Sequence, residues 1–197
     1  MDGVKRFVVL LLLAVVACTN ERPLPTVSTS EDLKKPQEGG TVVRRLQGDI
    51  ATLNPVMAQS VNDRQVDYYL HTPMVHFDAD LSAIPGLAEK WEISSDGRLY
   101  TLHLNPTATF SDGSNVTAGD VLFTLKKIID PQTEAPQIAG AFDQLDLRTT
   151  RVVDPHTIVV GFKDGISPQL AHFNDLLVIP EHVYARGDFK IDRKSVV

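Results

Sequence analysis

The sequence predicts an α+β fold in which mixed and antiparallel sheet is combined with short helices. Residues 91–104 carry two runs of alternating apolar and polar side chains around a turn, which is the pattern of a β-hairpin. Residues 117–131 place apolar side chains at helical spacing between a capping residue and a proline. A second pair of alternating runs follows at residues 147–162. The fold class follows from these two hairpins and the helix between them.

Three elements are expected ahead of the first hairpin. Residues 41–47 alternate in polarity and predict a strand, and residues 49–55 follow as a loop. Residues 61–71 predict a helix that Pro73 ends. Its apolar side chains at helical spacing are Val66, Tyr69 and Leu70.

The first hairpin has the clearest turn chemistry in the sequence. Trp91 and Ile93 alternate with polar neighbours, which predicts one buried face on the first strand. Ser95-Asp96-Gly97 forms the turn, because aspartate tolerates and glycine permits a positive φ. The return strand, residues 98–104, is expected to bury three side chains on one face: Tyr100, Leu102 and Leu104.

The helix after this hairpin is predicted from both of its ends. Thr117 is a good N-cap, and Asp120 three residues later predicts a capping box, with aspartate in place of the usual glutamate or glutamine. Pro131 cannot continue the helix. The side chains expected to face the core are Val121, Leu125 and Ile128.

The rest of the chain predicts a loop, a second hairpin and a short helix. Residues 133–136 are expected to form the loop. Strands are predicted at residues 147–153 and 158–162, joined by an Asp154-Pro155 turn. A short helix is predicted at residues 168–172.

Several short motifs occur together in the order and spacing of a known family. They are Gly86-Leu-Ala-Glu-Lys-Trp91, Ser95-Asp-Gly97, Tyr100-Thr-Leu-His-Leu104, Phe110-Ser-Asp-Gly113 and Val116-Thr-Ala-Gly-Asp120. With these motifs the chain resembles the family 5 extracellular solute-binding proteins, the dipeptide- and oligopeptide-binding components of bacterial ABC importers. The resemblance runs from about residue 39 to about residue 189, and Pro180-Glu-His-Val-Tyr184 resembles a structural element of the family.

The resemblance implies a two-lobed periplasmic-binding-protein fold of type II. This chain would supply the N-terminal part of lobe one and most of an extra subdomain, with the second lobe beyond Val197. In the family's pattern, the positions of Gln59, Val61 and Gln137 are expected to contact the ligand. Peptides are the leading ligand class, although sugars, nickel chelates, haem and opines are within the family's range. His71-Thr-Pro-Met-Val75 replaces an acidic-Gly pair of many relatives and is interpreted as subfamily variation rather than a site.

The first 17 residues have the composition of a signal peptide. Lys5 and Arg6 form a basic start, and residues 7–17 are an apolar run too short to span a bilayer. Val15-Val-Ala-Cys18 looks like a bacterial lipobox, and Cys18 is the only cysteine in the chain. We therefore expect Cys18 to carry a lipid. The alternative is a plain secretory signal with an incidental cysteine.

The residues between the cysteine and the folded part predict a tether. Residues 18–40 are expected to be the lipidated cysteine and a disordered segment, because Pro, Ser, Thr, Glu and Lys dominate there. Such a segment spans roughly 25 Å on average. Residues 41–197 are then the N-terminal part of the solute-binding domain, on the extracytoplasmic side of a membrane.

Charge and motif content argue against other functional classes. With 19 basic and 25 acidic side chains the net charge is −6, which disfavours binding to nucleic acid. No nucleophile elbow, P-loop, Rossmann fingerprint or zinc-binding histidine spacing occurs, so neither an enzyme nor a cofactor or metal is expected. Asp78-Ala-Asp-Leu-Ser82 imitates a calcium loop, but Ala83 stands where the loop needs glycine. A polar hairpin turn is the favoured interpretation of that segment.

Three functions stay open at this level. The first is a lipid-anchored subunit that captures peptides and delivers them to a membrane permease. The second is a truncated fragment of such a protein that does not bind ligand. The third is an unrelated lipoprotein enzyme.

Overall fold

The computed structural model describes residues 39–165 and 169–186. The chain divides into two units, residues 1–44 and residues 45–197. Residues 41–47 form no strand, and Val42 and Val43 are 87% and 89% exposed, so the strand predicted there is wrong. A strand needs a hydrogen-bonded neighbour, and no strand of the described residues pairs with this segment. Cys18 and the predicted signal peptide lie outside the described residues.

Helix α2 (Val61–Leu70) confirms the helix predicted at the start of the second unit. Its buried residues are Asp63 and Asp67, whereas Tyr69 and Leu70 are 65% and 39% exposed. The prediction of a buried apolar face on this helix is therefore wrong. The loop at residues 49–57 covers the acidic face, because the backbone N–H of Ala51 donates to Asp63 Oδ1 at 2.8 Å.

A small hairpin follows α2. Strands β1 (Val75–Phe77) and β2 (Ala83–Pro85) pair antiparallel. Asp78 Oδ1 accepts hydrogen bonds from the backbone N–H groups of Asp80 at 2.9 Å and Ser82 at 2.8 Å. The segment that imitates a calcium loop is thus the hairpin turn that the sequence favoured.

The main sheet has four antiparallel strands in the order β3-β4-β6-β5. Strands β3 (Ala88–Ile93) and β4 (Leu99–Leu104) confirm the first hairpin, and Gly97 in its turn has a φ of +70°. The predicted burial of Ile93 is wrong, since this residue is 47% exposed. Strand β3 lies at the sheet edge, where only one side is covered by a neighbour.

The second hairpin starts later than the sequence predicts. Strand β5 is Arg151–Asp154 and strand β6 is Thr157–Gly161. The backbone N–H groups of Thr149 and Thr150 donate to the carbonyl of Asp146 at 3.2 and 3.0 Å, so residues 147–150 form a turn instead of a strand. Strand β6 also pairs with β4, which places the two hairpins in one sheet.

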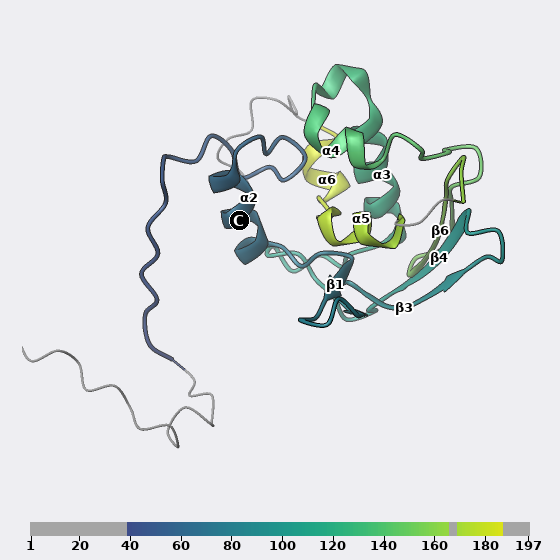
Figure 1. Ribbon diagram of the computed structural model, residues 1–197, viewed down its shortest axis with the longest axis horizontal. Helices are drawn as coiled ribbons and strands as arrows, with labels where there is room; N and C mark the ends of the chain where they lie inside the picture. The colour runs from purple at the N-terminus through teal and green to yellow at the C-terminus, as the bar shows by residue number, and fades with distance from the viewer. Residues whose placement is uncertain (1–38, 166–168, 187–197) are drawn as a thin grey trace, which may run out of the picture. The chain divides into compact units, whose positions relative to one another are not determined.

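The core lies on the face of β4 predicted from the sequence, since Tyr100, Leu102 and Leu104 are all buried. The Tyr100 ring contacts Phe162 edge-on at 5.4 Å between centroids and Phe173 at 5.6 Å. Figure 1 shows the helices α3 (Ala118–Ile129), α4 (Pro136–Ala141), α5 (Gln169–Asp175) and α6 (Glu181–Tyr184) grouped beside the sheet.

The ends of α3 are as predicted. Thr117 and Asp120 form the capping box in both directions, and Val121, Leu125 and Ile128 are buried. The loop expected at residues 133–136 is wrong in part, because a 3-10 helix (Pro131–Thr133) and α4 occupy this region. Glu134 between them has a φ of +56° and adopts the left-handed conformation.

Candidate functional site

The structure brings together two of the residues predicted to contact a ligand. Gln137 Nε2 donates a hydrogen bond to the backbone carbonyl of Gln59 at 2.8 Å, across 78 positions of sequence. Both side chains are exposed, and Val61, which follows Gln59 by two positions, is 83% exposed. These three residues form an open patch, which we call the Gln59–Gln137 surface.

Asp63 fixes the backbone on one side of this surface. Asp63 Oδ2 accepts from the N–H of Ser60 at 3.1 Å, and Ser60 Oγ accepts from the N–H of Asp63 at 3.0 Å. The sequence around Ser60 therefore folds as a capping box that starts α2 directly after Gln59. Burial opposes ionisation of Asp63, but the hydrogen bonds from Ala51 and Ser60 hold the pKa of its carboxyl below the usual value.

Helix α4 positions the other side of the surface. Pro136 is the first residue of the helix, where a missing N–H has no cost, and Ile138 is buried. Gln137 lies between them and is exposed. The helix therefore presents the Gln137 amide toward the segment that precedes α2.

The chemistry of the Gln59–Gln137 surface suits recognition. A glutamine amide carries two N–H donors and one carbonyl acceptor, and the bond to Gln59 uses one of the donors. Val61 adds an exposed apolar side chain. The surface thus offers neutral hydrogen-bonding groups beside an apolar contact, and it contains no nucleophile or general base.

The loop that leads to Gln59 and the helix α2 contain buried polar atoms that the sequence did not predict. Within the described ranges, Asn54 Nδ2, Arg64 Nη1 and both carboxylate oxygens of Asp67 have no hydrogen-bond partner. Burial and the charge of Asp63 raise the pKa of Asp67 to about 7, although the Arg64 charge acts in the opposite direction. The spacing of Asp63 and Asp67, one helical turn apart, is the signal that identifies this face of α2.

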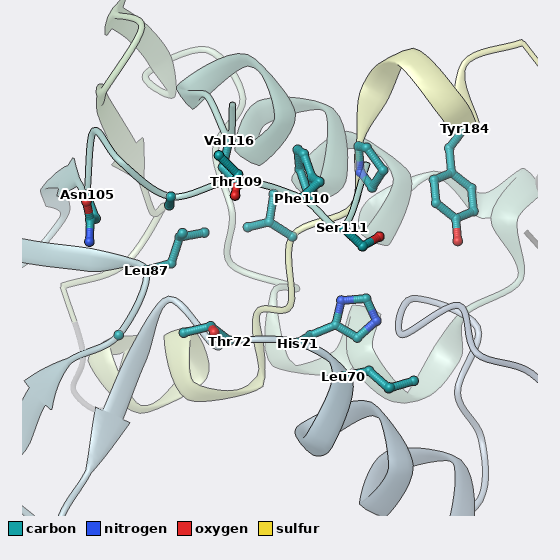
Figure 2. A pocket seen from close by; sticks show the side chains of 14 residues that line it. Leu70, His71, Thr72, Leu87, Asn105, Thr109, Phe110, Ser111, Val116 and Tyr184 are labelled. Atoms are coloured by element: carbon teal, nitrogen blue, oxygen red, sulfur yellow. The ribbon is translucent and has the colours of Figure 1, made fainter. Parts of the chain in front are cut away.

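A pocket lies at the other end of α2, and none of the predicted ligand residues lines it. Its volume is about 310 Å³. Figure 2 shows His71, Ser111 and Tyr184 at one end of the pocket, with Leu87 and Asn105 toward the other. The pocket wall therefore combines the residues after α2, the loop before α3, and α6.

Two polar contacts hold this pocket together. His182 Nε2 lies 2.7 Å from Asp112 Oδ2, which joins α6 to the loop that carries Phe110 and Ser111. Hydrogen bonds from Ser114, together with His182, lower the pKa of Asp112 to about 2. The backbone N–H of Leu87 donates to the carbonyl of Pro73 at 2.8 Å and closes the opposite side.

His71 is the pocket residue with the most perturbed environment. It is half-buried, and its Nε2 atom has no hydrogen-bond partner in residues 39–165 and 169–186. Burial lowers the pKa of the imidazole, and the backbone carbonyl of Leu53 only partly offsets this effect. The ring is therefore held in its neutral form at neutral pH.

Neither a metal centre nor a membrane span is found in the described part of the chain. No group of three or more His, Cys, Asp or Glu side chains there has the arrangement of a metal site. No helix among these residues is long and apolar enough to cross a membrane.

Comparison with known proteins gives a consistent result. The family described as bacterial extracellular solute-binding proteins, family 5 Middle, matches residues 82–196. The periplasmic oligopeptide-binding protein OppA of Salmonella typhimurium is 30% identical over 155 residues, which are 71% of this chain and 27% of that protein. OppA of Haemophilus influenzae is 35% identical over 163 residues, or 74% of this chain and 30% of that protein.

The fold agrees with these sequence matches. The crystal structure of Haemophilus influenzae OppA in complex with RPPGFSPFR superposes with a TM-score of 0.63 and 26% identity, covering 68% of this chain and 29% of that one. The chain therefore spans less than a third of the length of the relatives it matches. Its mixed helices and sheet are part of a type II periplasmic-binding-protein fold, as the resemblance implied. The chain belongs to the bacterial extracellular solute-binding proteins of family 5.

Proposed function

We propose that this chain is the N-terminal part of a subunit that captures peptides for an ABC importer. Membership of the solute-binding family supports a binding role over catalysis. The OppA relatives are named for oligopeptide binding, and one of them has been crystallised with the nonapeptide RPPGFSPFR. The single observation that carries the proposal is the contact between Gln137 and Gln59, which unites two expected ligand positions.

The proposed recognition uses the peptide backbone. An extended peptide exposes an N–H and a carbonyl at each residue, and the Gln137 amide can pair with both kinds of group. Val61 is 83% exposed and would then cover an apolar side chain of the ligand. Burying a valine side chain contributes about 1.5–3 kcal/mol.

The mechanism of transport follows from a difference in affinity between two conformations. A ligand that binds better to closed lobes than to open ones shifts the population toward the closed form. In this account the Gln59–Gln137 surface belongs to lobe one, a second lobe completes the cleft, and the closed form engages the permease.

Peptide titration with substitutions tests the proposal. We expect RPPGFSPFR to raise the melting temperature of the chain and Gln137→Leu to weaken binding about fivefold, because one hydrogen bond contributes about 1 kcal/mol. Gln132→Leu is the matched control, since Gln132 is also exposed, whereas the side chain that donates to Gln59 is that of Gln137. Equal losses in the two variants would refute a role for this surface.

Anchoring through Cys18 is a separate part of the proposal. The lipobox-like segment supports a lipoprotein held at the extracytoplasmic face of a membrane. Cells grown with a labelled fatty acid are expected to label the wild-type protein and not the Cys18→Ala variant. Label that persists in the variant would show that the lipid is attached elsewhere or that the label is nonspecific.

A further inference from the structure

Asp67 is a buried carboxylate in the middle of α2 that the function proposed above does not use. Its exposed fraction is 0%, and neither of its oxygens has a hydrogen-bond partner among the described residues. An ionised carboxylate in such a place loses its hydration without gaining a donor, and this cost is far larger than that of burying the neutral acid. The packing around Asp67 therefore favours a protonated carboxyl.

The loop before α2 contacts the helix on both sides of Asp67. The backbone N–H of Ala51 donates to Asp63 Oδ1 at 2.8 Å, one helical turn before Asp67. The backbone carbonyl of Leu53 pairs with the imidazole of His71, the C-cap residue four positions after Asp67. Because positions four apart on a helix lie on one face, the loop runs past the face that carries Asp67.

The same loop leads into the Gln59–Gln137 surface. Three of its side chains, those of Asn54, Val56 and Ala58, are buried, which holds the loop in one packed arrangement. Gln59 follows directly, and its backbone carbonyl accepts the hydrogen bond from Gln137 Nε2 at 2.8 Å. A shift of the loop relative to α2 is therefore expected to disturb the contact between these two glutamines.

The charges on α2 itself give an ionised Asp67 little support. Burial and the charge of Asp63 raise the pKa of Asp67 to about 7, and the opposing charge of Arg64 has the smallest of the three effects. His71 contributes no charge at neutral pH, because burial lowers the pKa of its imidazole.

The elements that contact α2 do not bring a cation to this carboxylate either, in the part of the chain that the structure describes. The loop carries one charged side chain, Asp49, and it is exposed. On α5, Asp175 Oδ1 accepts from the Tyr68 hydroxyl at 2.7 Å. His172, the other titratable side chain of α5, packs instead against Phe142, with 6.1 Å between ring centroids.

We propose that Asp67 is a positioning residue for the Gln59–Gln137 surface: its protonated form lets the loop pack on α2 and holds Gln59 against Gln137, and its ionisation loosens the loop and this contact. The consequence for ligand capture rests on the function proposed above. Capture is then strongest in acidic surroundings and weakens as the pH rises.

The direction and size of the effect follow from proton linkage. The packed arrangement raises the pKa of Asp67 from 3.8 to about 7, so it gains stability from the bound proton below this range and loses it as the pH rises through the range. Between pH 5 and pH 8 the population of the packed loop relative to the loosened loop falls by up to about a hundredfold.

Amide hydrogen exchange of the full chain, measured by NMR, tests the proposal without a ligand. The protection factor of the Ala51 amide is expected to fall by up to about a hundredfold between pH 5 and pH 8 in the wild type and to stay nearly constant in Asp67→Asn. A protection factor that does not depend on pH in the wild type, or that changes equally in the variant, would overturn the proposal. If Asp67→Asn does not fold, Asp67→Ser replaces it.

The side-chain amide of Gln137 reports whether the loop moves Gln59. Its resonances are expected to shift toward those of a free glutamine side chain between pH 5 and pH 8 in the wild type, and not in Asp67→Asn. The exposed side chain of Gln132 is the control in the same spectra. A constant Gln137 signal while Ala51 loses protection would refute the positioning role.

Asp63→Asn separates this role from a merely structural one. It removes the carboxylate oxygen that accepts from the N–H of Ser60, and it leaves Asp67 in place. Protection of the Ala51 amide is expected to be lower at both pH values, and its pH dependence is expected to persist, because burial is the largest cause of the raised pKa of Asp67. A pH dependence that disappears in Asp63→Asn would contradict the assignment to Asp67.

Titration with RPPGFSPFR at pH 5 and pH 8 measures the effect on capture separately. The affinity is expected to fall more in the wild type than in Asp67→Asn, and the titration of the peptide itself is common to both. An equal fall in the two proteins would overturn the effect on capture. If Ala51 and Gln137 respond as expected but the bound peptide shifts no residue of the Gln59–Gln137 surface, the positioning role stands and peptide recognition by this surface is refuted.

Discussion

Asp63 and Asp67 lie one turn apart on the same face of α2 and have opposite electrostatic environments. Both side chains are buried. Asp63 accepts hydrogen bonds from Ala51 and Ser60, which lower its pKa despite burial. Asp67 has no hydrogen-bond partner within the described residues, and burial raises its pKa to about 7. Two identical carboxylates thus favour opposite protonation states because of the groups around them.

The first prediction concerns the pH dependence of stability. The pKa of Asp67 in the folded state, about 7, is above the ordinary value of 3.8 for an aspartate, so the folded state binds an extra proton between these pH values. Its contribution to stability is therefore lost as pH rises from about 4 to about 7, by up to about 4 kcal/mol. Asp67→Asn removes this dependence, because the amide stays neutral.

Urea unfolding at pH 5 and pH 8 measures this effect. The gain in free energy of unfolding on Asp67→Asn is expected to be larger at pH 8 than at pH 5. Comparing variant and wild type at each pH cancels the contributions of Asp63 and His71, which both proteins share. Asp164→Asn, at an exposed position, is the control for the loss of a surface charge. A pH-independent effect of Asp67→Asn would mean that Asp67 is ionised in the folded state.

At the scale of elements, α3 organises the segment that leads into α6. Asp120 closes the capping box, and its Oδ1 also accepts from the N–H of Glu181 at 2.9 Å. Thr124 Oγ1 donates to the carbonyl of Asp120 at 2.7 Å and accepts from the N–H of Ile179 at 3.1 Å. One helical turn of α3 therefore satisfies the backbone N–H groups of Ile179 and Glu181, which flank the pocket residue Pro180.

The second prediction follows from the double role of the Thr124 hydroxyl. Thr124→Val keeps the shape of the side chain but leaves the buried N–H of Ile179 without an acceptor. The expected loss in free energy of unfolding is about 1–3 kcal/mol. Thr107→Val, at an exposed position, is expected to change it by less than about 0.5 kcal/mol. If urea unfolding shows that both variants lose the same free energy of unfolding, the hydrogen bond to Ile179 contributes nothing to stability.

The third prediction concerns two glycines with opposite surroundings. A Cβ atom at Gly86 would collide with the backbone oxygens of Pro73 and Met74, whose segment pairs with residues 86–88. A Cβ atom at Gly140 in α4 would meet nothing within 4 Å. Gly86→Ala is expected to destabilise the fold by about 1–3 kcal/mol, and Gly140→Ala to stabilise it by about 0.5–1 kcal/mol. Melting temperatures that shift in the same direction in both variants would contradict this explanation.

The elements that the sequence predicted well are those with local signals at both ends. The capping box at Thr117 and the turn at Gly97 are examples, because each depends on residues within a few positions of one another. The strand at residues 41–47 was wrong because a strand depends on a partner that local alternation does not reveal. The predicted apolar face of α2 was wrong because the buried face of this helix carries Asp63 and Asp67, and Asp63 accepts a hydrogen bond from the backbone of the loop at residues 49–57.

At the scale of the whole molecule, the strand order β3-β4-β6-β5 could not be predicted from local sequence patterns. It pairs Tyr100 with Val160, which are 60 positions apart in the sequence. The pocket was missed for the same reason, because residues 70–72, 105–111 and 178–184 meet only in the folded chain. The three residues of the Gln59–Gln137 surface were predicted from the family resemblance, because nothing in the chemistry of their side chains alone identified them as ligand contacts. The contact between Gln137 and Gln59 was not predicted from either source.

Mapping a bound peptide onto the chain tests the central claim most directly. In a two-dimensional NMR titration of the labelled chain with RPPGFSPFR, the largest shift changes are expected at Gln59, Val61 and Gln137, and the pocket residue His71 is expected to stay unchanged. A peptide that binds while leaving these three residues unchanged would contradict the proposal that this surface recognises peptides.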